Sequence, residues 1–185
     1  MNRTLPVFVA GALALIGSTA HAQGRAFPPI GPDIGYSYFL DSKTRSVFGS
    51  SATEYGIGFG KTTPSLGGRV GLDLSIVRPK QDTVTGKNKA LVIFAGPQLA
   101  RIVGVKTVND LTGVVPYYGA SLNAIYAQVE TPFSGSNGNG YGAGASVFAG
   151  ASFNRRLFLE GRLRAATKIE SYSFSTASLT LGIRF

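Results

Sequence analysis

The sequence contains no cysteine and no tryptophan, and only one methionine and one histidine among its 185 residues. The absence of cysteine excludes a disulfide framework, a thiolate zinc site and a cysteine nucleophile. The single histidine, His21, lies in a segment that we expect to be cleaved off. Catalysis that depends on an imidazole general base is therefore excluded from the mature chain. Charged residues make up only 15% of the sequence, against about 25% in typical soluble proteins.

Glycine and positive charge are in excess. The chain has 25 glycines, about twice the usual share of roughly 7%, and a formal net charge of +9. The basic residues are scattered, and the aromatic residues occur in strand-like runs rather than beside clusters of lysine and arginine. This pattern is not that of a nucleic-acid-binding surface, so we expect no nucleic-acid partner.

The first 22 residues have the pattern of a secretory signal peptide. A positive charge at Arg3 precedes an apolar run over 5–16, and Ala20-His-Ala22 fits a small-x-small cleavage site. An apolar run of about 12 residues is too short for a membrane-spanning helix, which needs about 20. We therefore predict a signal peptide over 1–22, a proline-containing lead-in over 23–32 and one domain over 33–185.

The domain shows recurrent alternation of apolar and polar residues, which is typical of β-strands. It is clearest where Val70, Leu72, Leu74 and Ile76 alternate with small and charged residues. The fourth segment is ambiguous, and Pro97 is expected to mark a bulge in it. Eight strands are predicted, at about 33–41, 53–60, 68–77, 90–101, 115–129, 141–153, 156–166 and 174–185.

Eight strands of about this length, joined by alternating long and short connections, predict an all-β fold: an eight-stranded antiparallel up-and-down transmembrane β-barrel. The outer loops are expected at 42–52, 78–89, 130–140 and 167–173, with the third rich in glycine, serine and asparagine. The inner turns are expected at 61–67, 102–114 and 154–155. Alternatively, the fourth strand extends through Val103 and Val105.

The apolar faces are expected to point outward, toward lipid. The opposite faces are rich in glycine and serine, which suit the narrow interior of an eight-stranded barrel. Aromatic residues also gather at the ends of the apolar faces, as in the two girdles of a membrane barrel. The expected outer girdle is Tyr55, Tyr126 and Tyr141, and the inner girdle is Phe59, Tyr118, Phe153 and Phe185.

The last strand has apolar residues at every second position, Leu179, Leu181 and Ile183, before the terminal Phe185. With the segment Asn154-Arg-Arg-Leu-Phe-Leu-Glu160, this strand resembles small eight-stranded outer-membrane barrels of the OmpA, OmpX and opacity-protein type. The resemblance covers 33–185. It implies a location in the outer membrane of a Gram-negative bacterium, and it implies insertion by the barrel assembly machinery, which recognises the final strand.

The expected lumen carries a network of charges. Its members are Glu54, Arg69, Asp73, Glu160, Arg162, Arg164 and Arg184. Charges inside a spanning protein need partners or water. Glu160 is expected to pair with Arg69 or Arg162, and Asp73 with Arg69 or Arg164. Such a network either plugs the barrel or lines a narrow pore, and eight strands leave little open cross-section.

The outer loops carry basic residues that face the level of lipopolysaccharide phosphates. They are Lys43, Arg45, Arg78, Lys80, Lys87 and Lys89. We therefore expect a non-enzymatic, monomeric surface or structural barrel whose loops contact lipopolysaccharide or external partners. No cofactor or metal site is predicted. The alternatives are a narrow channel for ions or small solutes, and a soluble barrel that binds a small apolar ligand.

Overall fold

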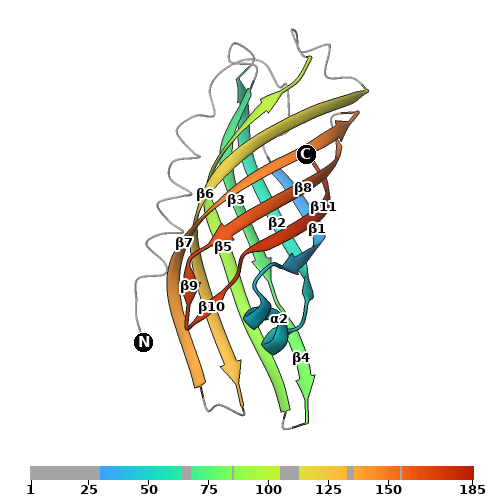
Figure 1. Ribbon diagram of the computed structural model, residues 1–185. Coiled ribbons are helices and arrows are strands. Elements are labelled where there is room, and N and C mark those ends of the chain that lie inside the picture. The colour runs from blue at the N-terminus through green and yellow to red at the C-terminus, as the bar shows by residue number, and fades with distance from the viewer. Residues whose placement is uncertain (1–29, 64–67, 85, 105–112, 133–135, 155) are drawn as a thin grey trace.

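The computed structural model describes residues 30–63, 68–84, 86–104, 113–132, 136–154 and 156–185. The predicted signal peptide and the lead-in up to residue 29 lie outside these ranges. Eight long strands wind into a barrel (Figure 1). They are β1 (Ile30–Phe39), β2 (Ser51–Thr63), β3 (Gly68–Val77), β5 (Gly86–Ile102), β6 (Val114–Thr131), β7 (Ser136–Phe153), β8 (Leu157–Ala166) and β11 (Thr176–Ile183).

Every long strand pairs with two neighbours, so the eight strands form a closed ring. The order is β3-β2-β1-β11-β8-β7-β6-β5, all pairings are antiparallel, and pairing of β3 with β5 closes the ring. The first and last strands, β1 and β11, lie side by side, with Tyr36 opposite Leu179. The predicted fold class, an eight-stranded up-and-down barrel, is confirmed. In the described part of the chain, no helix is long and apolar enough to cross a membrane.

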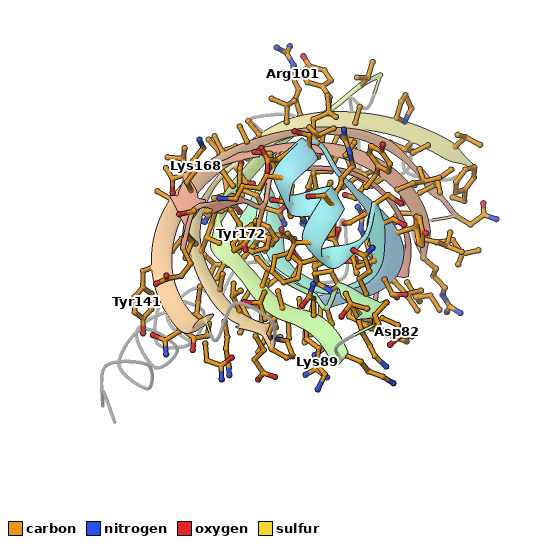
Figure 2. The ribbon with its side chains drawn as sticks, turned by 60° about the horizontal axis from the view of Figure 1, so that its bottom comes forward. Asp82, Lys89, Arg101, Tyr141, Lys168 and Tyr172 are labelled. Atoms are coloured by element: carbon orange, nitrogen blue, oxygen red, sulfur yellow. The ribbon has the colours of Figure 1, made fainter. Side chains whose placement is uncertain are left out.

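Shorter elements gather at one end of the barrel. They are the helix α2 (Ser42–Phe48) and the strands β4 (Lys80–Thr83), β9 (Lys168–Ile169) and β10 (Tyr172–Ser173). We call this the helix end. The opposite end, where β1 begins and β11 finishes, is the terminal end. Figure 2 looks toward the helix end and shows α2 lying across its mouth, inside the ring of strands.

The apolar faces point outward, as the sequence predicts. On β11, Leu179, Leu181 and Ile183 are all exposed, while Thr176, Ser178 and Thr180 on the opposite face are buried. The same alternation holds on β1, where Tyr36 is 60% exposed and Ser37 is fully buried. Because successive side chains of a strand point to opposite faces, the local pattern alone fixes which residues line the interior.

Two strands begin earlier than predicted, at segments that contain proline or several glycines. β1 begins at Ile30, three residues earlier than expected, and includes Pro32 opposite Ile57. β7 begins at Ser136 and pairs with β6 up to Thr131, so most of the expected third outer loop is strand. Glycine and proline weaken a strand in isolation, but pairing with β2 holds the start of β1 in the sheet, and pairing with β6 holds the start of β7.

The expected bulge at Pro97 is absent. The register between β5 and β6 runs unchanged from Ala95 opposite Ala124 to Gln98 opposite Ser121, so no extra residue is inserted. The strand also ends at Ile102 and does not extend through Val103. What marks this region is a close backbone approach, because a Cβ atom on Gly96 would lie 1.8 Å from the carbonyl oxygen of Leu122.

Three expected loops at the helix end contain regular structure. The segment 42–52 holds α2 and the first residues of β2, 78–89 forms a hairpin of β4 and the start of β5, and 167–173 carries the hairpin of β9 and β10. These elements are too short for their periodicity to be read from sequence. At the terminal end, the tight turn between β7 and β8 is as predicted, with Asn154 in the left-handed conformation that asparagine tolerates.

The limits of α2 follow from its capping residues. The carboxylate of Asp41 accepts hydrogen bonds from the backbone nitrogen of Thr44, at 2.8 Å, and from its hydroxyl, at 2.9 Å. Gly49 ends the helix at a φ of 90°, which only glycine adopts without strain. Phe48 points into the barrel and packs edge-on against Tyr172, with ring centroids 5.0 Å apart. The helix is thereby fixed across the mouth.

We expect α2 to loosen in acid through Asp41. Its hydrogen bonds with Thr44, first the backbone one, lower the pKa of Asp41 in the folded protein. The stabilisation is therefore complete above the ordinary aspartate pKa of about 3.9 and is lost as the pH falls through the lower folded value. In Asp41→Asn the cap remains but its dependence on pH disappears. Hydrogen exchange of α2 between pH 2 and 6 tests this, and an unchanged acid response in the variant would contradict it.

Candidate functional site

The interior of the barrel is filled in three layers. At the helix end, buried apolar side chains form a plug that includes Phe39, Phe48, Phe94, Ile125 and Phe174. At the terminal end, a second apolar cluster consists of Ile102, Val115, Tyr117, Phe148 and Phe158. The charged residues lie between these layers. We call this middle layer the charged belt and define it by Glu54, Asp73, Glu160, Arg162 and Arg164.

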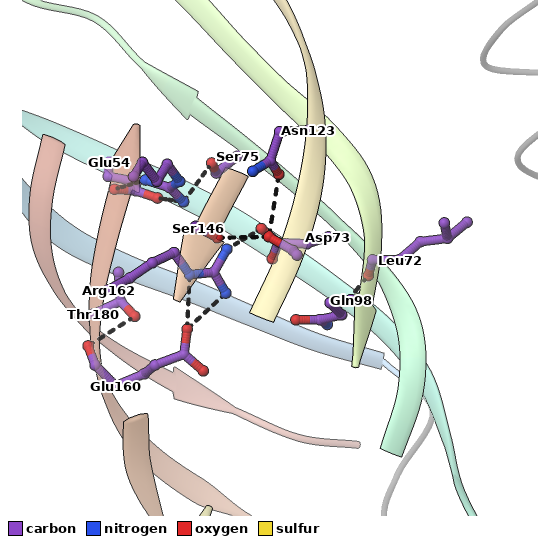
Figure 3. A network of polar contacts seen from close by, with 12 residues as sticks. Glu54, Leu72, Asp73, Ser75, Gln98, Asn123, Ser146, Glu160, Arg162 and Thr180 are labelled. Atoms are coloured by element: carbon purple, nitrogen blue, oxygen red, sulfur yellow. Dashed lines mark hydrogen bonds and ion pairs between the residues drawn. The ribbon is translucent and has the colours of Figure 1, made fainter. Parts of the chain in front are cut away.

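Arg162 is the centre of the belt (Figure 3). Its guanidinium contacts Glu160, with Nη2 2.6 Å from Oε1, and also donates to Asp73 on β3. Its face rests on the ring of Phe148, 5.0 Å from the centroid. β8 and β3 lie on opposite sides of the ring of strands. The Arg162–Asp73 ion pair therefore crosses the full width of the barrel.

A second ion pair crosses the barrel nearer to the helix end. The nitrogens Nη1 and Nη2 of Arg164 lie 3.0 Å and 2.5 Å from the two carboxylate oxygens of Glu54, a bidentate geometry. Nη2 also donates to the hydroxyl of Ser75 at 2.9 Å, and Ser37 donates to Glu54. Both charged side chains are almost fully buried. Buried charges are stable only when they are paired and hydrogen-bonded, and this geometry meets both conditions.

Ion pairs thus connect only some members of the predicted charge network. Of the predicted partners, Glu160 takes Arg162, whereas Asp73 takes Arg162 instead of Arg69 or Arg164. The pairing of Glu54 with Arg164 was not predicted. The two remaining predicted members, Arg69 and Arg184, lie toward the terminal end. There Arg184 stacks on Tyr117 and Phe158, 5.0 Å and 4.5 Å from the ring centroids.

Several interior residues were missed by the sequence reasoning. Asp33 points inward. Its carboxylate lies beside Gly56, where a Cβ atom would collide with it. It brings the inward carboxylates among the described residues to four, matching the four inward arginines. Tyr117 donates to Oε2 of Glu160 at 3.0 Å. The sequence did offer a signal for the apolar layers. Phe39, Phe94 and Phe148 are aromatic residues on strand faces that otherwise carry small residues, and all three lie inside the barrel.

The expected girdle residues all face outward. Tyr55, Tyr118, Tyr141 and Phe185 are exposed, and Phe59, Tyr126 and Phe153 are half-exposed. Tyr126 and Tyr141 face each other across β6 and β7, with ring centroids 5.3 Å apart. The residues of the predicted assembly signal, Leu179, Leu181, Ile183 and Phe185, are also exposed on the outer wall. Their placement at the two interfaces of a membrane stays a prediction.

The predicted basic patch divides into two groups. On α2, Arg45 donates to the carbonyl oxygens of Phe39 and Leu40, and Lys43 lies over the ring of Tyr172. These two residues are engaged with the protein itself. The other four, Arg78, Lys80, Lys87 and Lys89, are exposed on the outer wall near and along the hairpin of β4 and β5.

The hairpin brings like charges together. Lys80 lies directly opposite Lys89, and Asp82 lies opposite Lys87 with an ion-pair distance of 3.6 Å. Asp82 and Lys89 project from the rim in Figure 2. Directly opposed like charges destabilise a strand pair, so Lys80 and Lys89 do not stabilise the hairpin. We call Arg78, Lys80, Lys87 and Lys89 the basic hairpin.

Comparison with solved structures supports the fold. The crystal structure of Neisserial surface protein A matches with a TM-score of 0.56 and 19% identity, over 84% of this chain and 96% of that one. Two weaker likenesses are Ail of Yersinia pestis (TM-score 0.45, 15% identity, 86% and 99%) and the outer membrane enzyme PagL (0.48, 13%, 84% and 99%). The chain has the fold of small eight-stranded outer-membrane barrels.

No family model matches the sequence, and no curated protein is similar to it. At these levels of identity the likeness shows the fold alone. Function must therefore be argued from the residues of this chain.

Proposed function

We propose that this protein is a non-enzymatic, monomeric barrel of the Gram-negative outer membrane, with a structural and surface-interaction role. Its basic hairpin binds the phosphates of lipopolysaccharide. The observation that carries the proposal is the position of the hairpin. Arg78 continues the outward face of Ile76, and Lys89 continues that of Leu91. The positive charges therefore begin where the apolar wall stops, at the height of lipid phosphates.

Other features agree with this role. A single chain closes the ring of strands, so no second copy is required to complete the sheet. The outward row on β11 that ends at Phe185 fits insertion by the barrel assembly machinery. Two ion pairs and two apolar layers fill the interior, and such a rigid, filled barrel suits a scaffold better than the alternative, a narrow channel.

The proposal predicts that Lys80→Gln with Lys89→Gln weakens binding to lipopolysaccharide more than tenfold at low salt. Each basic residue near an anionic surface contributes about 1 kcal/mol, and the effect falls as salt rises. The double variant removes a repulsive pair, so the hairpin keeps its fold. Affinity is measured by titrating lipopolysaccharide into the refolded protein in a non-ionic detergent.

The matched control is Arg101→Gln with Lys168→Gln. It removes the same charge from exposed positions outside the hairpin, at the terminal end and on β9. Equal weakening in both double variants would show that binding depends on net charge alone and not on the hairpin. No weakening in either would reject the site. Discrete conductance steps of the wild-type protein in a planar bilayer would favour the channel over the filled scaffold.

A further inference from the structure

Among the described residues, Arg69 forms no ion pair with a carboxylate. Arg162 engages both Asp73 and Glu160, and Arg164 engages Glu54. In the part of the chain that the structure describes, Nε and Nη2 of Arg69 are buried and have no hydrogen-bond partner. A buried guanidinium with open N–H groups is costly unless something accepts from them. This site requires an acceptor.

A second hydrogen-bond donor, the side-chain amide of Gln98, lies near Arg69. A Cβ atom built on Gly58 would lie 3.5 Å from Nη2 of Arg69 and 3.6 Å from Nε2 of Gln98. The amide of Gln98 donates only at 3.5 Å, to the carbonyl oxygen of Leu72, which is the weak limit of a hydrogen bond. Two underused donors therefore converge on a position where Gly58 supplies no side chain.

The surroundings hold a second cation as well as the carboxylates of Glu160 and Asp73. Arg184 lies close enough to Arg69 to interact with it electrostatically, and it is held in place by stacking on Tyr117 and Phe158. A cation with open N–H groups, Arg69, and a second cation that repels it favour an anion over a neutral ligand. The planar guanidinium fork of Arg69 matches the oxygens of a phosphate or carboxylate.

We propose that Gly58, Arg69 and Gln98 form a binding site for a small oxyanion of the phosphate class, inside the barrel near its terminal end. Gly58 carries no side chain that would compete with the ligand, while Arg69 and Gln98 donate hydrogen bonds to its oxygens. Arg184 contributes charge. The site does not depend on the basic hairpin, which lies at the other end and on the outer wall.

The test is a titration of inorganic phosphate into refolded protein, followed by calorimetry, in octyl glucoside because that detergent carries no phosphate. We expect saturable binding by the wild type. Arg69→Gln should weaken it at least tenfold. Gly58→Ala should do the same while keeping the charge, because its methyl group would make ordinary van der Waals contacts of 3.5 Å or more and so leave the fold intact. A heat-dependent gel shift confirms that each variant is folded.

Arg101→Gln is the matched control, since Arg101 lies opposite Gly68, one residue from Arg69, but is exposed on the outer wall. It should bind phosphate within twofold of the wild type. The proposal is overturned if the wild type shows no saturable binding, if Gly58→Ala binds normally, or if Arg101→Gln weakens binding as much as Arg69→Gln. Gly58→Ala should still bind lipopolysaccharide normally, which separates this test from that of the proposed function.

Discussion

Replacing Arg162 by methionine should destabilise the folded barrel by at least about 3–5 kcal/mol, the usual effect of breaking a buried ion pair from one side. We expect a value at the top of that range because Arg162 pairs with two carboxylates at once. Its loss leaves the buried carboxylates of Asp73 and Glu160 without their ion-pair partner. Tyr117 still donates to Glu160 but carries no compensating charge. Urea unfolding in lipid vesicles measures the loss.

A compensated variant separates the charge effect from packing. Arg162→Met combined with Asp73→Asn and Glu160→Gln removes all three charges and should recover most of the lost stability, since neutral amides are far cheaper to bury. The exposed pair of Asp82 and Lys87 provides the comparison. Breaking it with Lys87→Gln should change stability by only about 0–1 kcal/mol. If the Arg162→Met variant were as stable as the wild type, the cross-barrel pairs would not hold the interior together.

Leu74→Arg should prevent assembly in the membrane. Leu74 lies on the outward face of β3, between Ile57 and Ala95 of the neighbouring strands. An arginine on the lipid face near the bilayer midplane costs about 2–4 kcal/mol. That is a large share of the stability of a small domain, which is typically about 5–15 kcal/mol. The yield of the heat-modifiable, folded form in lipid vesicles is the measurement.

Val84→Arg is the control for Leu74→Arg. Val84 lies at the tip of the hairpin of β4 and β5 and is fully exposed beyond the wall, so an arginine there stays in water. Its folded yield should equal that of the wild type. Normal insertion of Leu74→Arg, or soluble expression of the wild-type protein without detergent, would contradict the lipid-facing assignment and favour the soluble barrel.

The interior shows how far prediction from the sequence reaches. Alternation places Glu160, Arg162 and Arg164 on one inward face of β8, because residues two apart in a strand share a side. It does not say which of them meets Asp73 or Glu54. Those partners come from β3 and β2, across the barrel, at heights set by the stagger of all the intervening strands. The basic hairpin shows the same limit, since only pairing places Lys80 opposite Lys89.

By itself the sequence determined the number of strands, the outward apolar faces, the inward position of the arginines and the tight turn at Asn154. Each of these depends on neighbours a few residues apart and on the two-residue repeat of a strand. Only the tertiary structure decided that α2 covers one mouth, that apolar layers enclose the charged belt, that Asp33 lies inside, and that Arg69 faces Gly58 and Gln98 with no ion-pair partner among the described residues. These features join residues far apart in the chain, and closure of the barrel, rather than any local pattern, sets their distances.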